Sequence, residues 1–302
     1  MGLNLSGMTT ETRNPRTMQL DQMSPLEIVT VMNEEDARVP LAIAKCLPQI
    51  AQAVTWAAES FEKGGRLFYM GAGTSGRLGV LDAAECPPTF GVPKEMVVGL
   101  IAGGEKAFIE AVEGAEDSRE LAVEDLKAHG LTADDFVVGI AASGRTPYVL
   151  GGLDYAKSVG CHTAAIACNI GSAIGKAAEL AIEVNCGPEV LTGSTRLKSG
   201  TAQKLILNMI STGSMVRTGK AYQNLMVDVQ QTNEKLHTRA ENIVIDATGV
   251  EREKARAAID AAGGSVKTAI TMLLADCDAA EAARRLEKAR GHVREAIQLE
   301  VL

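Results

Sequence analysis

The sequence predicts an α/β protein in which helices cover both faces of a parallel sheet, giving three layers. Short apolar runs alternate with helical patterns between residues 66 and 184, and only helical patterns follow Asn233. The chain has 302 residues, of which 46% are hydrophobic and 23% are charged. This composition is typical of a globular protein with one large domain and additions, or with two domains.

The N-terminal region is predicted to begin as a polar arm and to continue as two helices. The first 20 or so residues have no hydrophobic periodicity, so we expect them to be ordered by docking on the rest of the protein. Ser24 can cap a helix that has Pro25 at its first position and Glu27 at its third. A second helix is predicted from about Ala37 to Phe61, with a bend near Pro48.

The central region is predicted to contain five parallel strands. Its apolar runs have strand length, are apolar on both faces and are mostly followed by Gly, Ser or Asn, which is typical of a sheet covered on both sides. The predicted strands are Arg66 to Met70, Met96 to Ala102, Phe136 to Ala142, His162 to Cys168 and Leu180 to Val184. A long helix from about Arg196 to Thr218 ends this region.

Four amphipathic stretches near the C-terminus predict a small helical bundle. They are Leu236 to Thr248, Glu251 to Ala262, Val266 to Leu274 and Ala279 to Ala289, with Ile259, Ile270, Leu273 and Leu286 as the expected core. We therefore predict three parts: residues 1–56 for the arm and the first helices, residues 57–220 for the sheet domain, and residues 234–302 for the helical domain.

The composition also argues against several classes of protein. Thirty Lys and Arg against 38 Asp and Glu give a net charge of -8, and only 3% of residues are aromatic, so nucleic acid is not an expected partner. No leader pattern or uninterrupted apolar run of membrane length is visible, so no membrane partner is expected. Six scattered cysteines without a C-x-x-C pair predict reduced thiols, no metal site and a cytoplasmic location.

A glycine-rich turn follows the first predicted strand. Gly71 to Gly76 fits G-x-G-x-x-G, but the second strand ends in Ile101 to Gly104 and lacks the acidic residue that a dinucleotide site needs. Thr74 and Ser75 can offer hydroxyls beside the free N–H groups of a helix start, which suits a phosphate monoester. Taken alone, the turn is equally consistent with Ser75 only capping that helix.

A second hydroxyl-bearing loop follows the third predicted strand and favours the phosphate interpretation. It contains Ser143, Gly144, Arg145 and Thr146 and leads into a helix that begins near Pro147. Loops at the carboxyl ends of parallel strands form the ligand pocket of such folds, so we expect a sugar phosphate here. The pattern G-x-x-x-x-G-K-[ST] is absent, so a nucleoside triphosphate with magnesium is not indicated.

Several segments together resemble the N-acetylmuramic acid 6-phosphate etherase family over nearly the whole chain. They are Thr9–Asn14, Gly71–Arg77, Asp82–Thr89, Val112–Ser118, Ala142–Pro147, Gly193–Lys204, Asn224–Asp228 and Thr232–His237. The resemblance implies a flavodoxin-like sugar isomerase (SIS) domain, no cofactor and association as a homodimer. It also implies cleavage of the D-lactyl ether to N-acetylglucosamine 6-phosphate and D-lactate, in the catabolism and recycling of cell-wall amino sugars.

The same resemblance implies that Glu85 is the catalytic acid and Glu116 the base. Elimination from an open-chain sugar needs two such groups in opposite protonation states. The sequence around each agrees: the paired prolines at 87 and 88 place Glu85 at the end of a helix, whose negative terminus disfavours the ionised form. Glu116 falls at the start of the helix through Leu121 to His129, whose positive terminus favours the carboxylate.

The sequence does not assign a role to several basic residues. Arg77 and Arg145 can bind the phosphate or pair with surface acids, and whether Lys198, Lys235 and His237 contact substrate is not decided by the sequence.

Two rival functions share the expected domain. An aldose–ketose isomerase uses the same proton abstraction at C2, but the segment around Glu85 is particular to the etherases. SIS domains also act as sugar-phosphate sensors in transcription regulators and in a regulator of a hexose kinase. A transcription regulator would need a basic helix-turn-helix, which is not evident, and the kinase regulator is much longer than 302 residues.

Overall fold

The computed structural model describes residues 7–110, 112–229 and 233–299, which form two compact units. The first unit comprises Met1–Ala84 and Glu95–Ser211, and the second comprises Glu85–Lys94 and Thr212–Leu302. Among the described residues, none of the helices combines the length and the apolar character needed to cross a membrane.

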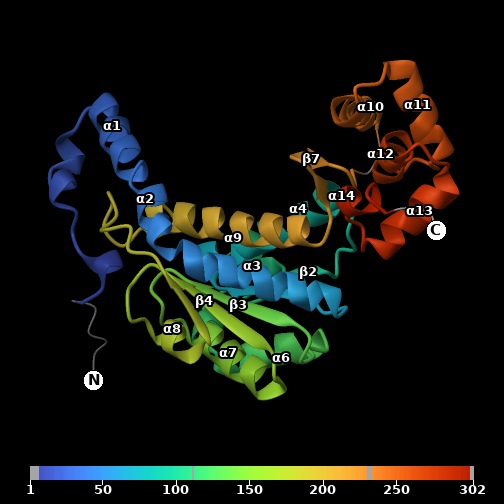
Figure 1. Ribbon diagram of the computed structural model, residues 1–302. Helices are drawn as coiled ribbons and strands as arrows, with labels where there is room; N and C mark the ends of the chain where they lie inside the picture. The colour runs from blue at the N-terminus through green and yellow to red at the C-terminus, as the bar shows by residue number, and fades with distance from the viewer. Residues whose placement is uncertain (1–6, 111, 230–232, 300–302) are drawn as a thin grey trace. The chain divides into compact units, whose positions relative to one another are not determined.

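A five-stranded parallel sheet forms the centre of the first unit and confirms the predicted strands (Figure 1). The strands are β1 (Leu67–Gly71), β2 (Val97–Ile101), β3 (Phe136–Ala141), β4 (His162–Ala167) and β5 (Leu180–Glu183). Their order is β2-β1-β3-β4-β5. Gly71 pairs with Ile101 on one side and with Ile140 on the other, so β1, β2 and β3 end at nearly the same level.

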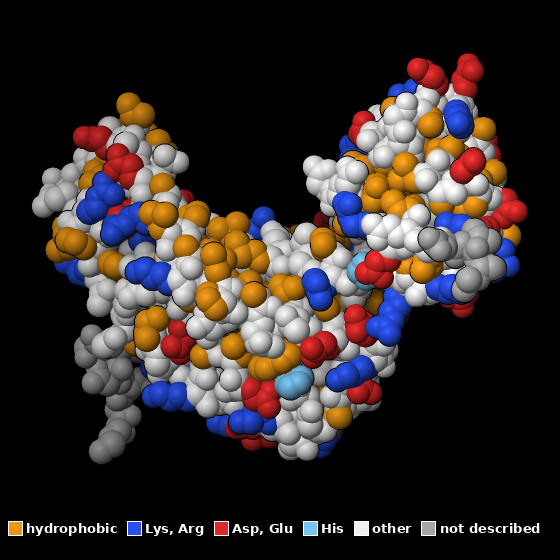
Figure 2. All heavy atoms as spheres, viewed as in Figure 1, with side chains coloured by type: hydrophobic (Ala, Val, Ile, Leu, Met, Phe, Trp, Pro, Cys, Tyr) orange, Lys and Arg blue, Asp and Glu red, His pale blue; other side chains and the backbone are white. Residues whose placement is uncertain are grey.

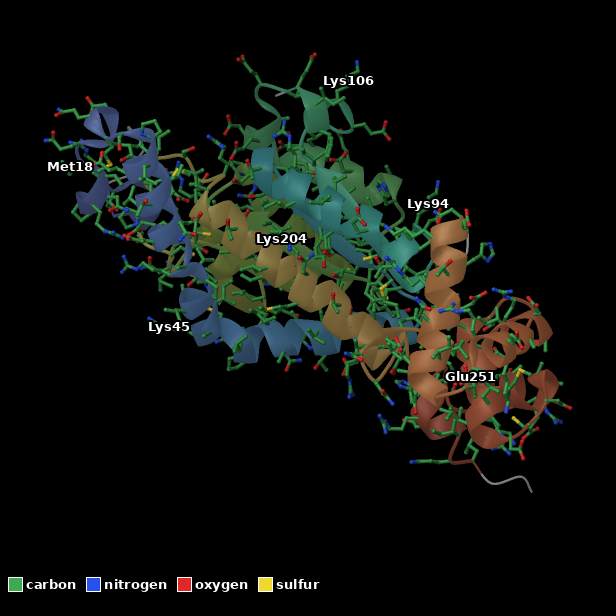
Figure 3. All side chains as sticks on the ribbon, turned by 90° about the horizontal axis from the view of Figure 1, so that it is seen from above. Met18, Lys45, Lys94, Lys106, Lys204 and Glu251 are labelled. Carbon is green, nitrogen blue, oxygen red and sulfur yellow. The ribbon has the colours of Figure 1, made fainter. Side chains whose placement is uncertain are left out.

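Helices cover both faces of this sheet, as the apolar runs predict. One face carries α3 (Leu47–Glu62) and the first-unit parts of α4 (Gly73–Phe90) and α9 (Lys198–Arg217); seen from above, α9 with Lys204 lies between α3 and α4 (Figure 3). The other face carries α6 (Arg119–Ala128), α7 (Pro147–Val159) and α8 (Ala173–Ala177) (Figure 1). Along β1, Phe68 and Met70 pack in the core with α6 and α7, whereas the Tyr69 hydroxyl donates to the Leu207 carbonyl of α9.

The N-terminal region docks on the sheet domain and then forms more helices than predicted. Three short 3-10 helices, η1 (Thr9–Glu11), η2 (Pro15–Thr17) and η3 (Leu20–Gln22), precede α1 (Pro25–Asp36), which has the predicted capping box of Ser24 and Glu27. The single helix expected from Ala37 to Phe61 is instead α2 (Val39–Ile43), η4 (Ala44–Cys46) and α3. Pro48 explains the break, because it lacks the N–H that would continue the helix from Ala44.

The second unit contains the four predicted C-terminal helices. They are α10 (Glu234–Thr248), α11 (Arg252–Ala261), α12 (Val266–Ala275) and α13 (Ala279–Lys288). The predicted core residues Ile259, Ile270 and Leu286 are buried, and Leu273 packs against them. A short hairpin of β6 (Ala221–Tyr222) and β7 (Leu225–Met226) and a final turn, α14 (Val293–Ala296), were not predicted, because two- and four-residue elements carry no periodicity.

Candidate active site

Three segments that bear predicted site residues meet at one edge of the sheet. They follow β2, β1 and β3, which are adjacent and parallel, so their carboxyl ends lie side by side. The chain leaves β1 toward β2 on one side and returns to β3 on the other, which makes the β1–β3 boundary the topological switch point. Open α/β sheets bind ligands at this place.

The turn after β1 is tight and leads directly into α4. Gly76 has no room for a side chain, because a Cβ there would lie 2.6 Å from the Gly71 carbonyl oxygen and 2.7 Å from Ile101. Ser75 is the third residue of α4 and is buried, and its Oγ donates to Gln203 Oε1 at 3.0 Å. Its hydroxyl therefore bonds to α9 in place of capping its own helix. Thr74 is half-buried at the same turn.

The loop after β3 is held by both conformation and hydrogen bonds. Gly144 has a φ of +75°, and a Cβ there would lie 2.4 Å from that of Ser172, so only glycine fits. Asn169 donates from Nδ2 to the carbonyl oxygens of Ala142 and Ser143, at 3.3 Å each. Ser143 and Arg145 are half-buried, and Thr146 is buried at the N-cap position of α7.

Asn169 also forms hydrogen bonds with the N-terminal arm, which lies beside this loop. Its Nδ2 donates to Thr10 Oγ1 at 3.0 Å, and its Oδ1 accepts from the Thr10 N–H at 3.4 Å. Thr10 is buried, so the arm is ordered by docking, as its polar sequence suggests. Sequence reasoning missed Asn169 as an individual residue; the available signal was its position just after the fourth strand.

Glu116 lies in the segment after β2 and is bonded to the loop after β3. It is exposed, and its Oε1 accepts a hydrogen bond from Thr146 Oγ1 at 2.9 Å. The prediction that it starts the helix through Leu121 is wrong: Glu116 lies in the 3-10 helix η5 (Ala115–Asp117), and α6 begins after Ser118, whose Oγ accepts from the Leu121 N–H. The carboxylate is therefore bonded to the N-cap residue of α7.

The prediction that the prolines end the helix just after Glu85 is also wrong. The helix α4 continues through Pro87 and Pro88 to Phe90, and Gly91, with a φ of +62°, then donates its N–H to the Pro87 carbonyl. The φ of proline is itself helical, so prolines near the end of a helix remove two donors without ending it. Glu85 is exposed on α4 and belongs to the second unit, whereas Glu116 belongs to the first.

Two basic residues left open by the sequence have protein partners. Arg77 donates from Nε to the Phe108 carbonyl at 2.7 Å and from its terminal NH2 to the Ala107 carbonyl at 2.8 Å, so it holds α5 (Lys106–Ile109). Lys198 is buried, with its Nζ 2.5 Å from Glu35 Oε2. Both contacts occupy groups that could otherwise have bound a ligand anion.

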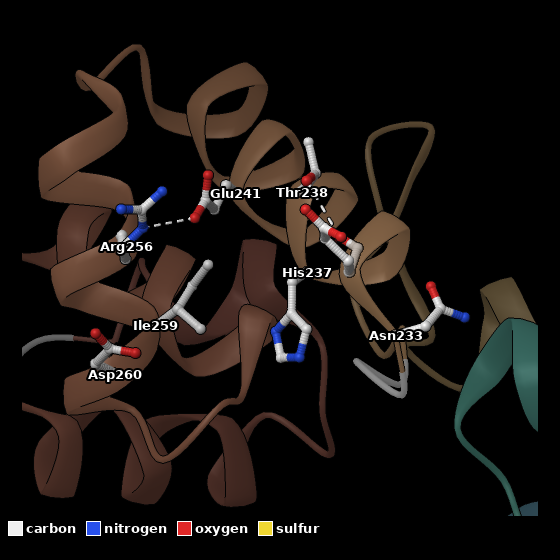
Figure 4. A pocket seen from close by; sticks show the side chains of 8 residues that line it. Asn233, His237, Thr238, Glu241, Arg256, Ile259 and Asp260 are labelled. Atoms are coloured by element: carbon white, nitrogen blue, oxygen red, sulfur yellow. Dashed lines mark hydrogen bonds and ion pairs between the residues drawn. The ribbon is translucent and has the colours of Figure 1, made fainter.

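The second unit contains a cavity of about 510 Å³ between α10 and α11 (Figure 4). Its wall includes His237, Ile259 and Asp260, and the ion pair of Arg256 with Glu241, whose Nε and Oε1 are 2.7 Å apart. None of the residues predicted to bind phosphate lines this cavity. The sequence assigns no substrate contact to Lys235 or His237, and of these two residues His237 lies on the wall of this cavity.

A buried carboxyl group lies one turn before Glu85 on α4. The Asp82 Oδ1 accepts from Asn208 Nδ2 at 2.6 Å and from Ser211 Oγ at 3.1 Å. Burial raises the pKa of Asp82 above its ordinary value, although these hydrogen bonds act in the opposite direction. Asp82 and its partners thus bind the middle of α4 to α9 within the first unit.

Comparisons with known proteins agree with this architecture. A family model described as the glucokinase regulatory protein N-terminal SIS domain matches residues 49–157, and the SIS domain model matches residues 120–212. A solved structure from Bacteroides fragilis, described provisionally as a phosphosugar isomerase involved in capsule formation, has a TM-score of 0.52 and 21% identity. That similarity covers 67% of this chain and 95% of the other, and it shows the fold.

Curated relatives match over the full length. A protein of an Exiguobacterium species named N-acetylmuramic acid 6-phosphate etherase is 63% identical, over 97% of this chain and 100% of the relative. One of the same name from Serratia proteamaculans is 61% identical, over 98% of this chain and 99% of the relative. Identity at this level over both full lengths shows that the chain belongs to the N-acetylmuramic acid 6-phosphate etherase family.

Proposed function

We propose that this protein is a carbon–oxygen lyase that cleaves the D-lactyl ether of N-acetylmuramic acid 6-phosphate, giving N-acetylglucosamine 6-phosphate and D-lactate. Family membership over the full length supports the reaction. The observation in the structure that supports it most directly is the Glu116 carboxylate. It is exposed and held by Thr146, at the edge of the sheet where two hydroxyl-bearing loops meet.

The chemistry begins with the open-chain form of the sugar. The ether oxygen on C3 is then β to the C1 aldehyde, so removal of the C2 proton gives an enolate that can expel the C3 substituent. Glu116 is the base in this proposal, and the hydrogen bond that Thr146 Oγ1 donates to Oε1 orients its carboxylate. Glu85 donates a proton to the departing lactate oxygen, and water then adds to the unsaturated aldehyde to restore a hydroxyl at C3.

The phosphate is assigned to the two loops. Thr74 and Ser75 lie at the N-terminus of α4, and Ser143, Gly144, Arg145 and Thr146 lie between β3 and the N-terminus of α7. Helix N-termini and hydroxyl groups both favour an anion. The contact of Thr146 with Glu116 supports a second role for this hydroxyl, which is to orient the base.

We further propose that the protein is a homodimer and works in the cytoplasm. Hydrophobic side chains gather over the face on which α2 and α3 lie (Figure 2). Leu41 and Leu47 there are 70% and 47% exposed, which suits a surface covered by a second copy. The cytoplasmic location is supported by the six cysteines, which are all free thiols.

Isotope exchange can separate the roles of the two glutamates. In deuterated water, Glu116→Gln should lose both exchange at C2 and release of D-lactate, because no base removes the proton. Glu85→Gln should still exchange deuterium into C2 but release D-lactate about 10² to 10⁴ times more slowly, because an alkoxide leaves poorly without an acid. Glu113→Gln, an exposed neighbour of the base, is the matched control and should behave like the parent.

Three results would count against this proposal. Absence of D-lactate release from N-acetylmuramic acid 6-phosphate by the parent protein would exclude the reaction itself. Retained exchange in Glu116→Gln would exclude that residue as the base. Release of D-lactate at the parental rate by Glu85→Gln would exclude it as the acid.

A further inference from the structure

The side-chain amide of Gln203, which contacts the turn after β1, makes a hydrogen bond through only one of its two polar atoms. Gln203 is 1% exposed, and its Oε1 accepts a hydrogen bond from Ser75 Oγ at 3.0 Å. Its Nε2 has no hydrogen-bond partner among the described residues. A buried donor without an acceptor is unfavourable, and native proteins contain few of them. The orientation of this amide therefore needs an explanation.

The direction of the Ser75–Gln203 hydrogen bond matters for anion binding. A serine hydroxyl has one proton, and here Ser75 donates it to Gln203. In this arrangement Ser75 can offer only lone pairs to a group at the N-terminus of α4. Phosphate oxygens are acceptors as well, so Ser75 would repel the phosphate that it is assigned to bind.

A half-turn of the Gln203 amide resolves both difficulties. The oxygen and nitrogen of the amide exchange places with almost no change in shape. Nε2 then donates to Ser75 Oγ, and the hydroxyl proton becomes available to a phosphate oxygen. The buried atom without a partner is then a carbonyl oxygen, which proteins tolerate better than an N–H group. Consecutive hydrogen bonds from amide to hydroxyl to anion also strengthen one another.

We propose that Gln203 is a positioning residue for substrate phosphate: its amide N–H donates to Ser75 Oγ and thereby directs the Ser75 proton to the phosphate. Gln203 acts through Ser75 and does not itself touch the ligand, which agrees with the burial of the amide position that faces away from Ser75. This inference rests on the proposed function, because it uses the assignment of Ser75 to phosphate binding.

A double-mutant cycle tests the proposal. The dissociation constant of N-acetylglucosamine 6-phosphate is measured by calorimetry, with N-acetylglucosamine as the ligand without phosphate. We expect it to rise roughly tenfold in Ser75→Ala and severalfold in Gln203→Met. The double variant should match Ser75→Ala, because without the hydroxyl Gln203 has nothing to orient. Gln49→Met, which removes another partly buried amide of the first unit, is the control and should bind like the parent.

A second variant tests the direction of the hydrogen bond. An ionised carboxylate can only accept, so Gln203→Glu should retain the Ser75 proton and weaken binding of the phosphorylated sugar more than Gln203→Met does. Urea unfolding of each variant shows whether the weaker binding occurs in a folded protein. If Gln203→Met does not fold, Gln203→Glu and Gln203→Asn replace it in the cycle.

The outcomes separate this inference from the function on which it rests. If Ser75→Ala binds the phosphorylated sugar like the parent, the assignment of the loop is wrong and the inference fails with it. If Ser75→Ala weakens binding but Gln203→Met does not, only the role of Gln203 is wrong. If Gln203→Met weakens binding equally with and without the Ser75 hydroxyl, Gln203 acts independently and the proposal is overturned.

Discussion

Replacing Glu35 with glutamine would leave the ammonium group of Lys198 buried without its anion. The Lys198 Nζ lies 2.5 Å from Glu35 Oε2, and both side chains are 1% exposed. Arg16 and Asn14 also donate to the same carboxylate, at 3.1 Å each. This cluster joins the N-terminal arm and α1 to the start of α9, so its loss should destabilise the first unit.

Two lines of reasoning give a similar magnitude for the stability that Glu35→Gln should lose. Burial opposes ionisation of Glu35, but the hydrogen bonds from Lys198 and Arg16 and the charge of Lys198 outweigh it and lower the pKa of Glu35 from 4.5 to about 2. At about 1.4 kcal/mol per pKa unit, this lowering corresponds to roughly 3 kcal/mol of stability. Removing one partner of a buried ion pair costs about 3 to 5 kcal/mol. We therefore expect Glu35→Gln to lower the free energy of unfolding by about 3 kcal/mol at pH 7.

The pH dependence has a definite sign. Because folding lowers the pKa of Glu35, its contribution is complete above the unfolded pKa near 4.5 and is lost as the pH falls toward 2. The difference in stability between Glu35→Gln and the parent should therefore be constant from pH 7 to about 5 and shrink below that. A difference that stayed constant down to pH 3 would contradict the assignment.

Urea unfolding followed by tryptophan fluorescence measures this effect in the first unit. The single tryptophan, Trp56, lies on α3 with its ring 5.9 Å from that of Phe136. Glu34→Gln is the matched control, because Glu34 is 50% exposed and pairs with Arg16 at the surface; we expect it to change stability by about 0.5 kcal/mol or less. Equal losses for the two variants, or a loss below about 1 kcal/mol for Glu35→Gln, would refute the reasoning.

Two further predictions concern catalysis and assembly. Arg77→Met should lower kcat roughly tenfold with little change in KM, because the guanidinium holds two carbonyls of α5 in the segment that leads to Glu116. Arg77→Lys should recover part of the loss, and D-lactate release measures both; an unchanged kcat in Arg77→Met would exclude this role. Sedimentation should show a dimer at micromolar concentration that dissociates on Leu41→Glu, and a fully active monomeric parent would exclude the proposed dimer.

The sequence allowed the sheet, and the edge at which the two hydroxyl-bearing loops lie, to be predicted because both depend on local patterns. Runs apolar on both faces indicate strands of a covered parallel sheet, and hydroxyl residues just after two such strands must lie at the carboxyl edge. The predicted helix end at Glu85 and the predicted helix start at Glu116 were wrong, because stronger helix-ending and helix-starting residues lie nearby. Gly91, not Pro87, ends α4, and Ser118 is a better N-cap than any residue beside Glu116.

Contacts between side chains that are far apart in the sequence could not be predicted from local patterns. Ser75 and Gln203 are 128 residues apart, and Glu35 and Lys198 are 163 apart. Nothing in the sequence links the two members of either pair, and polar side chains on helices are usually solvated. Only the folded arrangement of α1 and α4 beside α9 brings them into contact, so these two contacts could be found in the structure alone.

The hydrogen bonds of Ser75 and Thr146 bear on how the proposed phosphate site would bind an anion. Of the four hydroxyl groups assigned to it, Thr146 donates its proton to Glu116 and Ser75 donates to Gln203. The hydroxyls of Thr74 and Ser143 have no such acceptor among the residues that the structure describes. Because each hydroxyl has one proton, only Thr74 and Ser143 can donate to an arriving phosphate without breaking an existing hydrogen bond. In the proposed site, initial capture of the anion would therefore depend on these two groups and on the N-terminus of α4, and Ser75 would join only when its partner amide turns.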